Sequence, residues 1–164
     1  MGIRNAAKAI LIHDGKMLVN KNLNSIGDIC WGVPNGAIYY DLPGGGQNQY
    51  ETLEEAVIRE CIEESGYTVA VDRLAAVYEE ISINEKFRSE HEPYAHKVHF
   101  MFICRVTDQP QKPLAEKDFD MLESVWVDIE EMKGIPLYPR IIHSNLERIL
   151  QSNEVVYLGS ERIA

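Results

Sequence analysis

Residues 43–67 read PGGGQNQYETLEEAVIRECIEESGY, and they join three consecutive glycines to the clearest helical pattern in the chain. Apolar side chains recur on one stripe at helical spacing, which predicts a helix over Leu53–Ser65 with a face suited to a core. Thr52 and Glu55 have the spacing of a capping box at its start. Gly66 suits the left-handed position after its last turn.

Three glutamates of this predicted helix lie close together. Advancing about 100° per residue places Glu60, Glu63 and Glu64 within an arc of roughly 100° that overlaps the core-facing edge. Partial burial of like charges is costly unless a cation compensates them, and Arg59 points partly away from this arc. A divalent cation, which prefers oxygen ligands, explains the arrangement. A solvated acidic face is the alternative, whereas an EF-hand is a poor fit because these acids lie on a helix.

The glycines form a second candidate site. Gly44, Gly45 and Gly46 stand a few residues before the helix, and glycine lets a backbone approach a ligand closely. Exposed amides near a helix N-terminus suit phosphate oxygens. An ordinary turn is the alternative, and no Gly-Lys-Ser/Thr follows to make a Walker A loop.

Taken together, the loop and the helix resemble the Nudix box, the defining motif of the MutT-like Nudix hydrolase family. Two positions where the family usually has bulky aliphatic residues hold Cys61 and Tyr67, both apolar enough to pack. The motif spans 23 residues, and its seven fixed positions all match: Gly45, Glu51, Arg59, Glu60, Glu63, Glu64 and Gly66.

The resemblance implies a fold, a reaction and a set of site residues. The fold would be an α/β (α+β) Nudix-type α/β/α sandwich with a mixed central sheet. The reaction would be hydrolysis of the diphosphate linkage in a nucleoside diphosphate bound to another moiety, with Mg²⁺ or Mn²⁺. Glu60 and Glu64 would be the principal metal ligands, Glu63 a direct or water-mediated one, and the Gly44 carbonyl a further one. Glu51 and Arg59 would form an ion pair that orients helix and loop, and Gly66 would only end the helix.

The general base and the substrate contacts lie outside the motif. Glu123, three residues before Trp126, has the spacing of the family's loop glutamate, and Glu116 is a second candidate base. We expect Gly45 and Gly46 to contact the substrate, together with Tyr40 and Arg4. Other aromatic residues that can stack on a base, or simply pack in the core, are Trp31, Tyr39 and Tyr78.

The rest of the chain reads as strands around one early helix, with helices again at the end. A hairpin with a turn at Asp14-Gly15 is the strongest strand signal. Asn22–Ala37 and Asn84–Glu92 read as loops. The predicted strands are Asn5–Ile12, Lys16–Lys21, Ile38–Leu42, Tyr67–Val71, Leu74–Ile83, Lys97–Val106 and Ser124–Val127, and the predicted later helices are Asp128–Lys133 and Pro139–Gln151.

Charge and cysteine content limit the partners. The 164 residues carry a net charge of −10, which argues against a nucleic-acid polymer or an anionic membrane as partner. Half of that charge lies in Glu51–Glu64, which has six glutamates and one arginine. Three well-separated cysteines in no zinc-binding pattern favour a cytoplasmic protein. We therefore expect one domain over 1–164 that binds a small molecule; a homodimer, and a Nudix-fold nucleotide sensor without turnover, stay open as alternatives.

Overall fold

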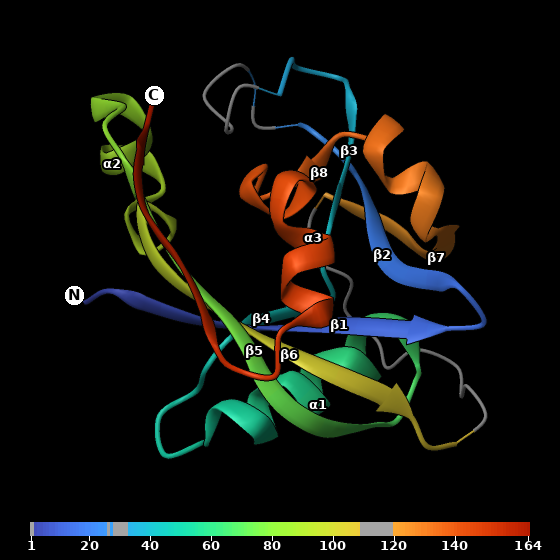
Figure 1. The fold of residues 1–164 in the computed structure, drawn as a ribbon. Helices are drawn as coiled ribbons and strands as arrows, with labels where there is room; N and C mark the ends of the chain where they lie inside the picture. Colours follow the sequence, from blue (N-terminus) through green and yellow to red (C-terminus); the bar gives the residue numbers. More distant parts are fainter. Residues whose placement is uncertain (1, 26, 28–32, 109–119) are drawn as a thin grey trace.

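A computed structural model describes residues 2–25, 27, 33–108 and 120–164, whose strands form one strongly curved mixed sheet (Figure 1). Along the main path the strand order is β8-β3-β2-β1-β6-β5-β9, while β4 pairs with β1 and β7 with β2. The pairs β1–β6, β3–β8 and β5–β9 are parallel and the others antiparallel. The strands are β1 (Arg4–His13), β2 (Lys16–Leu23), β3 (Ile38–Asp41), β4 (Gly44–Gly46), β5 (Val69–Ser82), β6 (His96–Val106), β7 (Met121–Asp128), β8 (Leu137–Tyr138) and β9 (Val156–Ile163).

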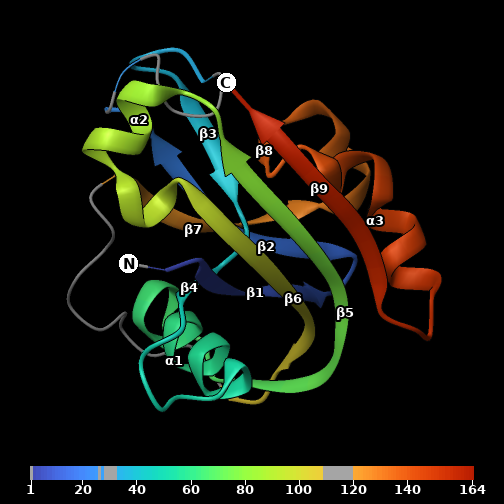
Figure 2. The same ribbon diagram turned by 90° about the vertical axis from the view of Figure 1, so that its left-hand side faces the viewer.

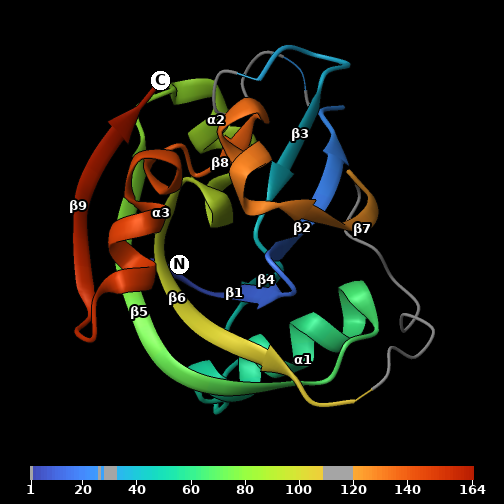
Figure 3. The same ribbon diagram turned by 45° about the vertical axis from the view of Figure 1, so that its right-hand side comes forward.

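Helices cover both faces of the sheet, as the predicted sandwich requires. Helix α1 (Leu53–Ser65) lies on one side of β1, β5 and β6, and α3 (Ile141–Gln151) lies on the other (Figure 1). Strand side chains alternate between faces. Ala7, Ala9 and Leu11 of β1 therefore pack in the cluster that contains α1. Ile10 packs in the second cluster with α3, around which β5, β6 and β9 curve (Figure 3).

The local signals around α1 are confirmed. The helix runs over the predicted residues, and the Thr52 hydroxyl accepts a hydrogen bond from Glu55 N at 3.1 Å. The Glu55 carboxylate in turn accepts one from Thr52 N at 2.8 Å. Gly66 has the left-handed conformation, with φ of 76°. The hairpin turn is also confirmed, since Asp14 and Gly15 both have positive φ.

Several expected elements differ. Tyr67–Val71 and Leu74–Ile83 are not two strands but parts of one strand, β5. This strand pairs with β6 along its length and accommodates two register shifts, one after Val71 and one after Leu74. Asn84–Glu92 is not a loop: it contains α2 (Glu85–Glu90) and leads into the short helix η1 (Glu92–Tyr94). The Asn84 side chain caps α2, accepting a hydrogen bond from Phe87 N at 3.0 Å, and Phe87 is buried.

The C-terminal end also adds an element. After η2 (Ile129–Gly134) and α3, the chain forms β9 at the sheet edge beside β5, a strand absent from our expectation. Cys61 and Cys104 are buried free thiols. Among the described residues, no helix combines the length and apolar character needed to cross a membrane. Cys30, Trp31 and Glu116 lie outside the described residues.

Candidate active site

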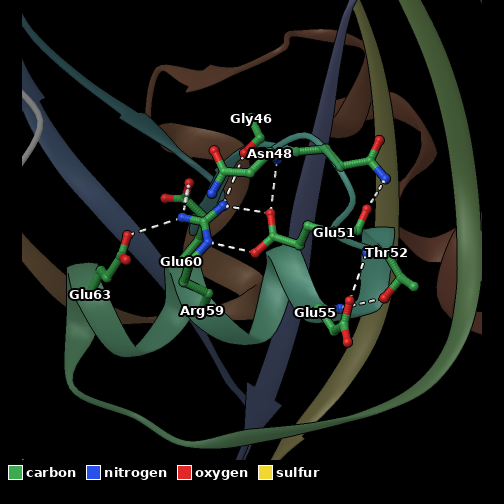
Figure 4. Close-up of polar contacts among 9 residues, drawn as sticks. Gly46, Asn48, Glu51, Thr52, Glu55, Arg59, Glu60 and Glu63 are labelled. Atoms are coloured by element: carbon green, nitrogen blue, oxygen red, sulfur yellow. Dashed lines mark hydrogen bonds and ion pairs between the residues drawn. The ribbon is translucent and has the colours of Figure 1, made fainter.

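Arg59 is the centre of a hydrogen-bond network between α1 and the loop that precedes it (Figure 4). Its guanidinium donates to both carboxylate oxygens of Glu51, from Nε at 2.7 Å and from Nη2 at 3.0 Å. Nη2 also donates to the Gly46 carbonyl at 3.0 Å. The Arg59 hydrogen bond lowers the pKa of Glu51, and the same bond raises the pKa of Arg59. The predicted ion pair between Glu51 and Arg59 is therefore present.

Arg59 also contacts two of the three glutamates grouped on one side of the helix, Glu60, Glu63 and Glu64, which we call the acidic arc. The helical angles alone placed this arc largely out of reach of the Arg59 side chain. Nη1 donates to Glu60 Oε1 at 2.8 Å and to Glu63 Oε2 at 3.1 Å. The long, branched side chain spans the angular gap to these two carboxylates. Its single positive charge is shared with Glu51, so the compensation of the acidic charges stays partial. Side-chain exposure is 15% for Glu60 and 42% for Glu63, so only Glu63 extends well into solvent.

Glu64 is the buried member of the arc, at 5% exposure. Its Oε2 accepts hydrogen bonds from Asn20 Nδ2 at 2.8 Å and from Gly44 N at 2.9 Å. Burial raises the pKa of Glu64 to about 8, although Lys8 nearby opposes the shift. A carboxylate in this environment is stabilised in its charged form by a further cation.

The glycines allow the loop to lie directly against these carboxylates. A side chain at Gly45 would place its Cβ 2.6 Å from Glu60 Oε1. Gly44 has φ of 131°, and a Cβ there would lie 2.1 Å from the Ala7 carbonyl oxygen. Gly44 therefore combines close backbone approach with a conformation that other residues rarely adopt.

The oxygen atoms gathered here are of the kind that Mg²⁺ and Mn²⁺ prefer. Glu60 lies against Gly45, and Glu64 is bonded to Gly44, so two carboxylates and the loop backbone share one small region. Two cationic side chains now contact this region: Arg59 at Glu60, and Lys8, whose Nζ donates to the Gly44 carbonyl at 2.7 Å. Within the described ranges, no three Asp, Glu, His or Cys side chains form a ready-made metal cluster. The chemistry of this donor set fits a divalent cation.

A cavity of about 400 Å³ opens beside the glycine loop. Its lining comes from β1, β3, β4, the ends of β5 and β6, and the α2–η1 segment. In Figure 2 this segment stands at the end of the molecule where β5 ends and β6 begins. The lining includes Arg4, Lys8, Tyr39, Gly44 and Gly45 beside the loop and, at the far side, Glu80, Lys97 and His99. The cavity therefore extends the candidate site away from α1.

The expected substrate contacts are placed differently from one another. Arg4 lies against Gly46, where a Cβ would be 2.6 Å from the guanidinium carbon, and both Arg4 and Gly45 line the cavity. Tyr40 instead packs against the apolar cluster beside α3, and its neighbour Tyr39 lines the cavity. Neighbouring side chains of β3 point to opposite faces, which explains why Tyr39 rather than Tyr40 lines the cavity.

Glu123 is not brought to the acidic cluster. It lies within β7 rather than in a loop, opposite Lys21 of β2, and its carboxylate is 3.8 Å from Lys21 Nζ. The adjacent Ser124 faces α1, since its hydroxyl donates to the Glu64 carbonyl at 3.4 Å as well as to Asn20 Oδ1 of β2 at 2.9 Å. Because neighbouring residues of a strand point to opposite faces, Glu123 points away from Glu64.

Sequence reasoning missed several polar residues that support the loop. Asn22 Nδ2 donates to Asp41 Oδ1 at 3.0 Å, and Lys8 Nζ lies 3.5 Å from Asp41 Oδ2. Asn20 and Asn22 are both buried. Their positions two residues apart on a strand place them on one face, and this spacing is a sequence signal for a polar site there. Lys8 is the single charge within the apolar part of β1, a second signal that was available.

Comparisons with known proteins identify the family of this chain and structures with a similar fold. The family model described as NUDIX domain matches residues 3–146. The mutator MutT protein from Bacillus halodurans has a TM-score of 0.65 and 18% identity, covering 98% of this chain and 90% of that chain. A NUDIX hydrolase from Nitrosomonas europaea gives 0.65 and 19%, covering 89% and 87%. An ADP-ribose pyrophosphatase from Streptococcus suis gives 0.61 and 16%, covering 95% and 99%.

The comparison with curated proteins finds no match. The family model, in contrast, spans most of the chain, including the glycine loop and α1. The chain therefore belongs to the NUDIX domain family of hydrolases.

Proposed function

We propose that the protein is a pyrophosphohydrolase that uses Mg²⁺ or Mn²⁺ to cleave the diphosphate linkage of a nucleoside diphosphate joined to another moiety. The observation that carries the proposal is the placement of Glu60 and Glu64 directly against Gly45 and Gly44, at the edge of a nucleotide-sized cavity. The name of the Streptococcus suis neighbour, an ADP-ribose pyrophosphatase, supports the same reaction class.

The chain's own residues divide the work. Glu60, Glu64 and the Gly44 carbonyl would hold the cation, with Glu63 as a further or water-mediated ligand. When bound, a divalent cation neutralises phosphate charge and lowers the pKa of a bound water. Glu51 and Arg59 fix the loop against the helix.

The cationic lining supports the proposed substrate class. Arg4 and Lys8 both reach the glycine loop from the cavity side, Arg4 at Gly46 and Lys8 at the Gly44 carbonyl. Phosphate oxygens entering along the loop would meet these two cationic side chains.

A substrate panel tests the proposal. We expect release of a nucleoside monophosphate from at least one of ADP-ribose, nucleotide sugars, dinucleoside polyphosphates or nucleoside triphosphates when Mg²⁺ is present. A chelator should abolish the release, and added Mg²⁺ or Mn²⁺ should restore it. Nucleotide binding without hydrolysis of any compound would instead favour the sensor alternative and overturn the proposed reaction.

Glu123 as general base is a separate prediction from the sequence, and the direction of its side chain, away from Glu64, argues against it. If it accepts the proton of the attacking water, Glu123→Gln lowers kcat by about 10²–10⁴-fold and removes the acidic limb of the pH–rate profile. Its only ion pair among the described residues is the exposed one with Lys21, so folding should be little affected. An unchanged pH–rate profile would exclude Glu123 as the general base and would make the carboxylates near the glycine loop the next candidates.

A further inference from the structure

Three polar side chains form a buried floor at the far side of the cavity from α1. Glu80 of β5 pairs with Lys97 of β6, and His99 lies two residues further along β6. The Glu80 carboxylate is 3.0 Å from Lys97 Nζ, and its other oxygen is 4.0 Å from His99 Nε2. All three are more than nine-tenths buried, and all three line the cavity. We call Glu80, Lys97 and His99 the polar floor.

The polar floor carries unused hydrogen-bonding capacity. Among the described residues, neither ring nitrogen of His99 has a hydrogen-bond partner, and neither does Glu80 Oε1 beyond its ion pair. Burial, with Lys97 nearby, holds the pKa of His99 well below its usual range, so the ring is neutral and offers one donor and one acceptor. Buried polar atoms are normally satisfied. These three atoms have almost no accessible surface, so a ligand in the cavity reaches them once the side chains of the floor shift as it binds.

The cavity walls suit a flat ring above this floor. Tyr39 and Tyr138 stand edge to face, with ring centroids 6.0 Å apart, on the side of β3 and β8. On the side of α2 and η1 lie Phe87 and Tyr94, the latter with the Arg4 guanidinium 4.8 Å from its ring centroid. Ala6, which pairs with His99 across β1 and β6, has a small side chain that leaves room over the floor. Aromatic walls of this kind stack on nucleobases.

We propose that the polar floor selects the nucleobase of the substrate and that the base it fits is guanine. The inference rests on the proposed function, since the same cavity leads to the glycine loop. A carboxylate only accepts hydrogen bonds and an ammonium only donates them. Guanine presents the O6 acceptor beside two parallel donors, N1–H and the 2-amino group. O6 matches Lys97, and the two donors match the carboxylate of Glu80.

The other bases match this order of groups less well. Adenine offers one amino donor beside the N1 acceptor, so one carboxylate oxygen would stay unpaired. Uracil offers a single N–H between two acceptors, one of which would face an acceptor of the floor. An unpaired buried polar group weakens binding, and a mismatched base edge costs roughly tenfold or more in affinity.

Binding of nucleoside monophosphates tests the floor separately from catalysis, because these compounds have no diphosphate linkage. Calorimetry on the wild-type protein should show GMP binding about tenfold or more tighter than AMP and UMP. IMP, which lacks the 2-amino group, should fall between GMP and AMP. Equal affinities for GMP and AMP, or no binding of GMP at millimolar concentration, would overturn the proposal without touching the proposed reaction.

A single substitution sharpens the test. Glu80→Gln keeps the shape but replaces one acceptor oxygen by a donor, and an amide forms two hydrogen bonds with adenine. We expect GMP affinity to fall about tenfold or more and the GMP/AMP preference to be lost or reversed. Glu79→Gln is the matched control, because Glu79 contacts His96 and Ser160 rather than the cavity. The same loss in both variants, or in neither, would refute the floor; the wild-type series stands even if Glu80→Gln folds poorly.

Discussion

Replacing Glu64 by glutamine is expected to lower hydrolysis by about 10²–10³-fold while leaving the fold intact. The substitution removes the one carboxylate of the acidic arc that is bonded directly to the backbone of the glycine loop, at Gly44 N. The amide oxygen of glutamine can accept the same hydrogen bond, so the loop stays in place and only the charge is lost. The measurement is kcat on the best substrate of the panel, with Mg²⁺ titrated against each protein.

The stability of this variant separates loss of charge from loss of structure. Burial raises the pKa of Glu64 to about 8, above its value in an unfolded chain, so the ionised form opposes folding as the pH rises above the unfolded value. Glutamine carries no such charge, so the metal-free variant should unfold at the same or a higher urea concentration than wild type at pH 7. Glu54→Gln, on the exposed side of the same helix, is the control and should change neither property. Full activity in Glu64→Gln would discard Glu64 as a metal ligand.

Replacing Gly44 by alanine is expected to damage both folding and activity. The Cβ would lie 2.1 Å from the carbonyl oxygen of Ala7 and 2.8 Å from Lys8 Cα, and both are backbone atoms that cannot turn aside. The φ of 131° adds strain of about 1–3 kcal/mol. The loop must then move away from β1 and from Glu64, so hydrolysis should fall with stability.

Urea unfolding and steady-state kinetics on the same preparations measure these two effects. Gly134→Ala provides the control, because a Cβ there meets nothing within 4 Å. That substitution should stay within about 0.5 kcal/mol of wild type. Wild-type stability and activity in Gly44→Ala would show that the loop does not need its close approach to β1.

The sequence predicts α1 to the residue because all its determinants are local. The Thr52–Glu55 capping box and Gly66 mark its ends, and the apolar stripe marks its buried face. The element that follows α3 carries no comparable signal: β9 depends on pairing with β5, about 80 residues away in the chain. The short α2 was missed for a similar reason, since one cap at Asn84 and one buried Phe87 hold it in place.

The same distinction between local and long-range determinants applies to the candidate site. The Nudix motif identifies the loop and the acidic helix because their residues are close in sequence, and Arg59 contacts Glu51 as the motif implies. Lys8, Asn20 and Asp41 reach the loop only through the pairing of β1, β2 and β3 with one another and with β4. The alternation of side chains on a strand decided the remaining cases, placing Tyr39 rather than Tyr40 in the cavity.

The glycine loop, β4, lies between the glutamates of α1 and the cavity. Glu60 and Glu64 press on it from the side of α1, while the cavity opens on its other side, where β5 and β6 supply the polar floor. Under the two proposals made above, the residues for bond cleavage and those for nucleotide choice lie on opposite sides of this loop. On that division, substitutions in the lining of the cavity would change which nucleotide is bound and leave the residues proposed for hydrolysis, on the α1 side of the loop, unchanged.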